Sequence, residues 1–304
     1  MEFKAFKMDG LGNDFIIIDQ RFKNITLSKD QIIKICDRKF IGCDQLIYIK
    51  KNRNIDAELE FYNSDGSKSG ACGNGTRCVA SLLSKENNKK EISVWTLSGN
   101  LKSKILNNNE IETEIGIPKL SWNEIPLTHD VDTRDLKIKL VSKDKKQFFG
   151  GIAVNVGNPH VIFFVEDLEN FNLEKIGPEI ENNILFPQKC NVTIAKKISK
   201  NLVKVKVWER GAGLTKACGT AACATAVASN LENLPNSKTE IEFSLGKLLI
   251  NIDEKKSIHM KGPGRFCLVR IVHVPVFAGR RERMMGVWKG DHHKKRIVAR
   301  VISI

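Results

Sequence analysis

The sequence of 304 residues lacks the motifs by which many cofactor-dependent enzymes are recognised. It has no GxGxxG segment after a predicted strand, which would bind a dinucleotide, and no glycine-rich loop ending in Gly-Lys, which would bind nucleotide phosphates. Its eight cysteines include no CxxC pair, and no histidine pair lies beside those at 72 and 78 or those at 218 and 223. We therefore expect neither a metal nor an organic cofactor.

Long apolar segments are also absent. No run approaches the ~18 apolar residues needed to cross a bilayer, and the N-terminal segment MEFKAFKMDGLGNDF has no apolar core typical of a signal peptide. We therefore expect no membrane contact and a cytoplasmic location, where cysteines stay reduced. Hydrophobic residues make up 41% of the chain and charged residues 28%, as in globular proteins, and the length suits about two domains.

Acidic residues are scarce near the C-terminus, which makes the whole chain basic. Of the net charge of +14, residues 261–304 contribute +9 (11 Lys and Arg against 2 Asp and Glu), and residues 1–260 contribute +5 (38 against 33). Residues 1–260 contain 25 Asn and 6 Arg, whereas residues 261–304 contain no Asn and 7 Arg. The excess charge belongs to this tail, so we expect no nucleic-acid partner. The change in residue usage indicates a segment of different origin, either a frameshifted end or an added basic extension.

Two Cys-Gly segments, Cys72-Gly73-Asn74 and Cys218-Gly219-Thr220, lie 146 positions apart. Each precedes a run of small residues that predicts a helix, so each cysteine is expected near a helix N-terminus. Backbone N–H groups and the helix dipole favour a thiolate there, and the same N–H groups can bind a carboxylate. Three further pairs keep a spacing of 145 or 146: Gly12-Asn13 with Gly157-Asn158, Gln45 with Asn191, and Asn63 with Glu209.

The common spacing indicates an internal duplication into two similar halves. Strands are predicted on either side of the GLGND and GNPH loops, and a helix is predicted over 28–39. A second short helix, over 173–183, is expected to be interrupted at Gly177-Pro178. Each half is thus mostly β with one prominent helix, which makes the fold class α+β. If both halves present the same loops to a pseudo-twofold axis, Cys72 and Cys218 face each other across the cleft.

Two facing thiols are suited to a reaction that is otherwise difficult. Removal of the α-proton of an amino acid leaves a poorly stabilised carbanion, for which pyridoxal phosphate usually serves as the electron sink. One thiolate can instead remove the proton, while a second thiol returns one from the opposite face. The configuration is then inverted, and the helix N–H groups can stabilise the carboxylate as negative charge builds on it.

The segments MDGLGNDF, YNSDGS, ACGNGTRC, VGNPH and ERGAGLTKACGTAACA resemble those of the diaminopimelate epimerase family, in order and spacing, from residue 3 to about residue 264. The resemblance implies a cofactor-free isomerase, similar in fold and mechanism to proline racemases. Such an enzyme interconverts LL- and meso-diaminopimelate in bacterial lysine and peptidoglycan precursor synthesis. The resemblance also implies two pseudo-symmetric domains, each a β-barrel-like, mostly antiparallel sheet around a central helix, with the active site between the domains. It further implies that the protein is a homodimer.

We expect the N-terminal half over 1–118, the C-terminal half over 119–262, and an atypical basic tail over 263–304. Members of the family usually end with one strand that returns to the first half. In this chain the segment LVRIVHVPVF is the candidate for that strand, although the resemblance ends near Gly264.

The resemblance also implies the roles of individual residues. Cys72 and Cys218 become the proton-exchanging pair, and His160 and Glu209 adjust their protonation. The positions implied to contact substrate are Asn13, Gln45, Asn63, Gly73, Asn74, Asn158, Asn191, Glu209, Arg210, Gly219 and Thr220. Arg210 suits the distal carboxylate of the substrate, since a guanidinium can bind it with a bidentate fork.

Two other hypotheses stay open. A related two-cysteine racemase would act on proline or hydroxyproline, in a smaller and more apolar pocket. A protein that is not an enzyme would use the cysteines for redox chemistry or the basic tail to bind nucleic acid. The remaining cysteines are predicted to be buried packing residues: Cys36, Cys43, Cys78, Cys190, Cys223 and Cys267.

Overall fold

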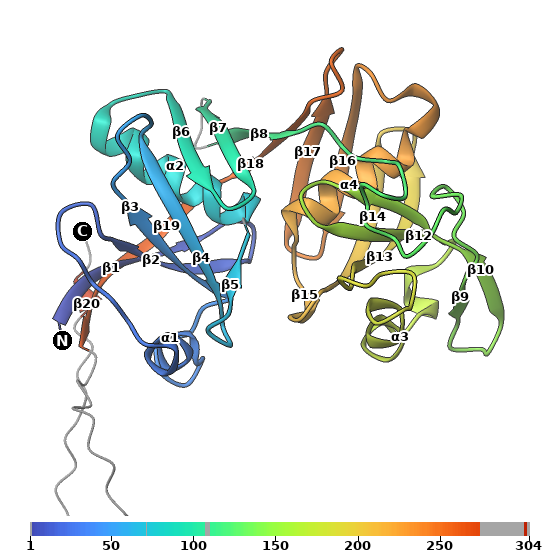
Figure 1. The fold of residues 1–304 in the computed structure, drawn as a ribbon, viewed down its shortest axis with the longest axis horizontal. Coiled ribbons are helices and arrows are strands. Elements are labelled where there is room, and N and C mark those ends of the chain that lie inside the picture. Colours follow the sequence, from blue (N-terminus) through green and yellow to red (C-terminus); the bar gives the residue numbers. More distant parts are fainter. Residues whose placement is uncertain (1, 71, 107–109, 274–300, 303–304) are drawn as a thin grey trace, which may run out of the picture.

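The computed structural model describes residues 2–70, 72–106, 110–273 and 301–302. Figure 1 shows two lobes side by side, with strands β8 (Glu110–Gly116) and β18 (Ile258–Pro263) running between them. These two strands pair antiparallel with each other. Within the described residues, all strands except the hairpin of β9 (Ile138–Val141) and β10 (Gln147–Gly150) belong to one continuous sheet.

The N-terminal lobe is formed mainly by eight strands and two helices of the described chain. In order they are β1 (Glu2–Asp9), β2 (Asp14–Asp19), α1 (Lys29–Cys36), β3 (Gln45–Lys50), β4 (Ala57–Asn63), β5 (Lys68–Ser69), α2 (Gly73–Asn87), β6 (Glu91–Thr96), β7 (Gly99–Ile105) and β8. The predicted strands around the GLGND loop and the predicted helix after Ser28 are confirmed. Helix α1 begins with a capping box, in which Ser28 and Gln31 each accept a hydrogen bond from the other's backbone N–H.

The C-terminal lobe repeats this order after β9 and β10. Its elements are β11 (Ile152–Asn155), β12 (Pro159–Phe164), α3 (Leu173–Glu181), β13 (Asn191–Ser199), β14 (Leu202–Glu209), β15 (Gly213–Thr215), α4 (Gly219–Ser229), β16 (Ser237–Phe243), β17 (Gly246–Ile252) and β18. The predicted interruption at Pro178 is wrong, because α3 runs through this residue. The apolar side of α3, with Ile176 and Ile180, packs into a core cluster and outweighs the one backbone hydrogen bond that proline removes.

Strand pairing repeats at the predicted spacing. The parallel pair Phe15 and Gln45 of β2 and β3 corresponds to the parallel pair His160 and Asn191 of β12 and β13. The residues that precede α2 and α4 also share one backbone conformation: φ −138° and ψ 114° at the first, φ −137° and ψ 117° at the second. Two pseudo-symmetric α+β halves are therefore confirmed.

The central helix of each lobe is enclosed by its sheet (Figure 1). Most of α2 is buried, in a cluster with Phe15, Ile47 and Phe61 of the surrounding strands. Helix α4 consists of small residues from Gly219 to Ser229, and its interior positions are buried all round. A helix without a polar face is stable only when enclosed. Each sheet therefore encloses its central helix, and the two helices contact each other.

The start of the atypical tail lies on the sheet of the N-terminal lobe. Strand β19 (Arg265–His273) pairs antiparallel with β1 from Glu2 to Asp9, and β20 (Val301–Ile302) pairs with β19. The rest of the tail, 274–300 and 303–304, lies outside the described residues. The domain limits at 118 and 262 stay predictions, because β8 and β18 link the two halves. None of the helices within the described ranges has the length and apolar character needed to traverse a bilayer.

Candidate active site

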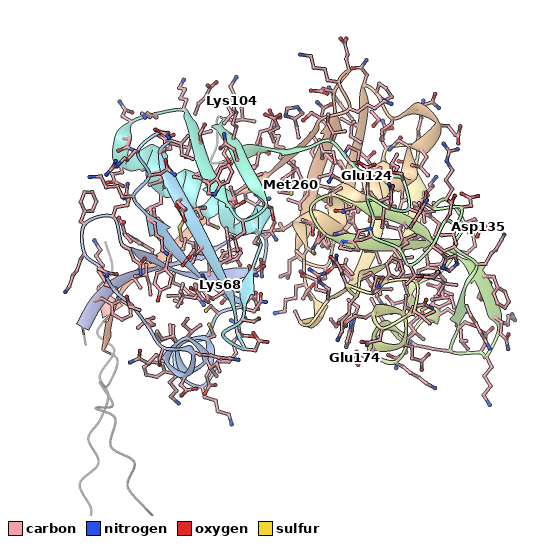
Figure 2. All side chains as sticks on the ribbon, in the orientation of Figure 1. Lys68, Lys104, Glu124, Asp135, Glu174 and Met260 are labelled. Atoms are coloured by element: carbon pink, nitrogen blue, oxygen red, sulfur yellow. The ribbon has the colours of Figure 1, made fainter. Side chains whose placement is uncertain are left out.

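The N-termini of α2 and α4 meet at Met260 of β18. A Cβ atom on Gly73 would lie 2.5 Å from Met260 Cε, and one on Gly219 would lie 3.0 Å from Met260 Sδ. Figure 2 shows Met260 where the two lobes adjoin. Cys72 precedes the first helix and is half-buried, and Cys218 precedes the second and is 5% exposed. The two Cys-Gly segments are thus brought to one junction, as the duplication predicted.

Cys72 lies beside a polar cluster from the N-terminal lobe. Its Sγ is 3.5 Å from Asn13 Oδ1, and Asn13 Nδ2 donates to Asp44 Oδ2 over 2.8 Å. The loop between β1 and β2 carries Asn13. Next to Asp44 in the chain, Gln45 Nε2 donates to Asn63 Oδ1 over 2.9 Å, across the β3–β4 pair. Of the predicted substrate-contacting residues, Asn13 therefore lies beside the Cys72 thiol. Gln45 and Asn63 are hydrogen-bonded to each other across the adjacent β3–β4 pair.

A second polar cluster lies at the corresponding place in the C-terminal lobe. His160 Nε2 is 2.8 Å from Asn158 Oδ1 and 3.5 Å from Asn191 Nδ2. Asn191 Oδ1 accepts a hydrogen bond of 3.0 Å from the backbone N–H of Arg210. The Arg210 side chain is exposed, and one of its NH groups donates to the Gln188 carbonyl. These predicted residues form one hydrogen-bonded group.

Glu209 connects the two thiols. The Cys218 thiol is hydrogen-bonded to its carboxylate, and the same carboxylate acts electrostatically on Cys72 in the other lobe. Burial raises the pKa of Glu209, and the negative charge of Asp44 raises it further. Cys218 Sγ also lies 3.4 Å from Thr220 Oγ1. One carboxylate therefore acts on groups from both halves.

Burial dominates the acidity of both thiols. It raises the pKa of Cys72 to about 12, against the backbone N–H of Gly75, which lowers it. It raises the pKa of Cys218 far above the usual range, and the negative charge of Glu209 adds to this. The backbone N–H groups of the first helical turns lower the pKa of each thiol, as the sequence predicted, but desolvation outweighs them, so the net shift of both pKa values is upward.

His160 is held as a neutral imidazole. Burial lowers its pKa to about 3, and the positive charge of Arg210 lowers it further. The side-chain oxygen of Asn158 faces its Nε2. Its Nδ1 has no hydrogen-bond partner among the described residues. The described hydrogen bonds of His160 lead to asparagines, so its role in thiol protonation stays a prediction.

Comparison with known proteins gives the family. The model of the diaminopimelate epimerase family matches residues 5–121 and 152–267. The chain is 70% identical over 263 residues to diaminopimelate epimerase of Pelagibacter ubique. The matched region covers 86% of this chain and 96% of that protein. The protein of the same name from Carboxydothermus hydrogenoformans is 42% identical over 270 residues, 86% of this chain and 96% of its own. The chain belongs to the diaminopimelate epimerase family.

Solved structures of other families share the fold. A phenazine biosynthesis protein of the PhzF family from Bacillus anthracis has a TM-score of 0.63 at 16% identity, over 90% of this chain and all of its own. A probable proline racemase from Agrobacterium radiobacter has a TM-score of 0.65 at 9% identity, over 90% of this chain and 94% of its own. At such identities these likenesses show the two-lobed fold alone.

Three residues of the junction were missed from the sequence. Asp44 accepts a hydrogen bond from Asn13 and raises the pKa of Glu209. Met260 lies at both helix N-termini, and Arg77 donates to its Sδ. The available signal for Arg77 was its place in the segment ACGNGTRC, where it is the one charged residue. Met260 has no sequence signal, because its position depends on β18 crossing between the lobes.

The other cysteines take part in no metal cluster of the described residues. Within the described ranges no three His, Cys, Asp or Glu side chains are grouped so that they could hold a metal ion. The predicted burial is confirmed for Cys36, Cys43, Cys78, Cys190 and Cys223. The side chain of Cys267 lies outside the described residues.

Proposed function

We propose that the protein inverts the α-carbon of LL-2,6-diaminopimelate to give meso-diaminopimelate, without pyridoxal phosphate, by a two-base thiol mechanism. The observation that carries this proposal is the meeting of two helix N-termini, each preceded by a cysteine in the same conformation. Membership of the diaminopimelate epimerase family supports the substrate. The reaction supplies lysine and peptidoglycan precursors.

In this mechanism the α-carboxylate of the substrate lies against the helix N-termini. The backbone N–H groups of Gly73, Asn74, Gly219 and Thr220 have no carbonyl partner within their own helices and suit an anion. As the α-proton leaves, negative charge moves onto this carboxylate, and the same groups stabilise it. The substrate is thereby held with one thiol on each side of its α-carbon.

The two thiols exchange roles with the direction of reaction. In one direction the Cys218 thiolate takes the α-proton and the Cys72 thiol donates its proton to the opposite face. Glu209 is hydrogen-bonded to Cys218 and is positioned to accept the thiol proton that must leave first. A thiol with a raised pKa gives a more basic thiolate, which suits removal of a weakly acidic C–H proton.

The distal end of the substrate explains the remaining polar residues. The exposed guanidinium of Arg210 suits a carboxylate fork, and the five asparagine and glutamine side chains offer both donors and acceptors to an ammonium and a carboxylate. They are Asn13, Gln45, Asn63, Asn158 and Asn191. A proline or hydroxyproline substrate has no second charged end, so this arrangement favours diaminopimelate. We further propose a homodimer in the cytoplasm, with no nucleic-acid partner.

The direct test is stereoisomer analysis by chiral chromatography. The protein is incubated with LL-diaminopimelate, L-proline or trans-4-hydroxy-L-proline, without added pyridoxal phosphate. We expect conversion of the first substrate alone, and a loss of at least ~10³-fold in Cys72→Ala and in Cys218→Ala. Cys190→Ala, a buried cysteine of another core cluster, serves as the matched control with activity kept. Turnover of a proline substrate alone would contradict the proposal, and turnover of none would favour a protein that is not an enzyme.

A further inference from the structure

Arg77 is a buried cation without a carboxylate partner. Its side chain is 0% exposed, in the second turn of α2. Among the described residues it forms no ion pair, and the groups that act on its charge are the thiols of Cys72, Cys78 and Cys223. Burial of an unpaired charge costs free energy, so a buried arginine without an acidic partner is rare. Its charge can be compensated by an anionic ligand that binds reversibly.

The guanidinium lies across the junction of the two lobes. It donates to Asn74 Oδ1 over 2.8 Å, to Met260 Sδ over 3.3 Å and to the Pro263 carbonyl over 3.2 Å. A Cβ atom on Gly262 would lie 3.3 Å from Arg77 Cζ, so β18 packs directly on the charged group. Its contacts therefore tie α2 to the strand that arrives from the other lobe.

The duplication explains why one cation serves both halves. At the spacing of 146, the counterpart of Arg77 in α4 is Cys223, and the two groups interact electrostatically. Near a pseudo-twofold axis, equivalent positions approach each other, and one large side chain fits where two would clash. The single charge therefore stands between the two helices and breaks their symmetry.

Asn74 links this charge to the helix N-termini. Because its Oδ1 accepts from Arg77, the orientation of its amide is fixed. That oxygen also lies 3.2 Å from the place of a Cβ on Gly219, so the side chain reaches the start of α4. Asn74 is 1% exposed, and its Nδ2 has no hydrogen-bond partner in the described part of the chain. A buried donor without a partner indicates a ligand acceptor.

We propose that Arg77 is a positioning residue of the carboxylate pocket: it orients the amide of Asn74 and places one permanent positive charge between the two helix N-termini. The inference rests on the proposed function, since the anion it serves there is the α-carboxylate of the substrate. The charge attracts a carboxylate and stabilises it further when the α-proton leaves.

The test compares two alkylating reagents of similar size, iodoacetate and iodoacetamide, at Cys72. Rates are measured by mass spectrometry of the Cys72 peptide, and the rate ratio of anionic to neutral reagent is compared among variants. Both reagents need the same thiolate with the same exposure, so a merely structural change alters both rates alike and leaves the ratio unchanged. No epimerisation is required, so failure of the proposed function would not affect the outcome.

We expect Arg77→Met to lower this ratio by roughly tenfold, the effect of ~1.4 kcal/mol of lost attraction. Arg77→Lys, which keeps a charge, should retain most of the ratio. Arg134→Met removes an exposed arginine paired with Glu232 and should match the wild type. An unchanged ratio in Arg77→Met would overturn the proposal.

Two measurements keep the test decisive if Arg77→Met does not fold. Arg77→Gln keeps a donor for Asn74 and loses the charge, and it should lower the ratio similarly. In the wild-type protein, the ratio should exceed that of N-acetylcysteine. A wild-type ratio no higher than that of N-acetylcysteine would overturn the proposal without any variant.

Discussion

Glu209→Gln is predicted to make both site thiols more reactive while it lowers turnover. The carboxylate of Glu209 raises the pKa of Cys218 and of Cys72, and glutamine removes the charge with little change in shape. At an effective dielectric constant of ~20, a unit charge ~12 Å away is worth ~1.4 kcal/mol, one pKa unit, and a closer charge is worth more. The thiolate fraction at a given pH should then rise at least about tenfold.

The gain in alkylation rate is smaller than the gain in thiolate. Nucleophilicity falls with pKa at a Brønsted slope of ~0.45, which removes about threefold for each pKa unit, so the net increase is at least about threefold. The assay is iodoacetamide modification at pH 8 to 9, followed by mass spectrometry of the peptides with Cys72 and Cys218. Loss of the proton acceptor should lower epimerisation at least ~10²-fold. Glu232→Gln is the control, because Glu232 is an exposed carboxylate paired with Arg134 and is not among the groups that act on either thiol. Unchanged or slower alkylation in Glu209→Gln would show that the charge of Glu209 does not raise the pKa of these thiols.

Three further predictions concern pH and packing. Because burial raises its pKa to about 12, alkylation of Cys72 should rise about tenfold per pH unit from 7 to 10, and a plateau near pH 7 would contradict this. Burial raises the pKa of Asp14, but hydrogen bonds, among them the one from Arg38, lower it to about 2 overall. The stability that comes from this lowered pKa is present above pH ~4 and is lost toward pH 2. In urea unfolding over that range, the free energy of unfolding of the wild type should fall by ~1–2 kcal/mol relative to that of Asp14→Asn, whereas parallel pH dependences would exclude the effect. Gly75→Ala puts a Cβ 2.7 to 3.2 Å from three core side chains and should lower the free energy of unfolding by ~1–3 kcal/mol in denaturant unfolding. In Gly150→Ala the new Cβ meets nothing within 4 Å, so this variant should lose under ~0.5 kcal/mol. Equal losses in the two variants would contradict the packing around Gly75.

The spacing of the sequence predicted the relation between the two halves, because a duplication preserves the distance between equivalent positions. It placed Cys72 and Cys218 before helices, because a run of small residues follows each cysteine. Sequence also predicted α1, since a capping box is a local pattern around Ser28. These features depend on neighbours within a few residues or on one fixed offset.

What the sequence did not predict depends on distant contacts. Cys72 packs against a core cluster that includes Met8 and Phe15, far from it in the chain. That burial raises the pKa of the thiol more than the helix N–H groups lower it. Helix α3 continues through Pro178 because core packing outweighs local preference. The contact of Arg77 with Met260 needs β18 to cross between lobes, which no local pattern encodes. Each of these features is determined by tertiary contacts rather than by the local sequence.

In the proposed mechanism, the Cys72 and Cys218 thiols exchange protons on opposite faces of one α-carbon. The most direct measurement is the hydrogen isotope at that carbon, after incubation of LL-diaminopimelate in deuterated water for the first turnovers. The account predicts one deuterium at the inverted centre of each meso product, protium in unreacted substrate, and no inversion in Cys72→Ala or Cys218→Ala. Full α-deuterium exchange in the Cys72→Ala/Cys218→Ala double variant, or product that keeps the substrate's own hydrogen, would contradict it.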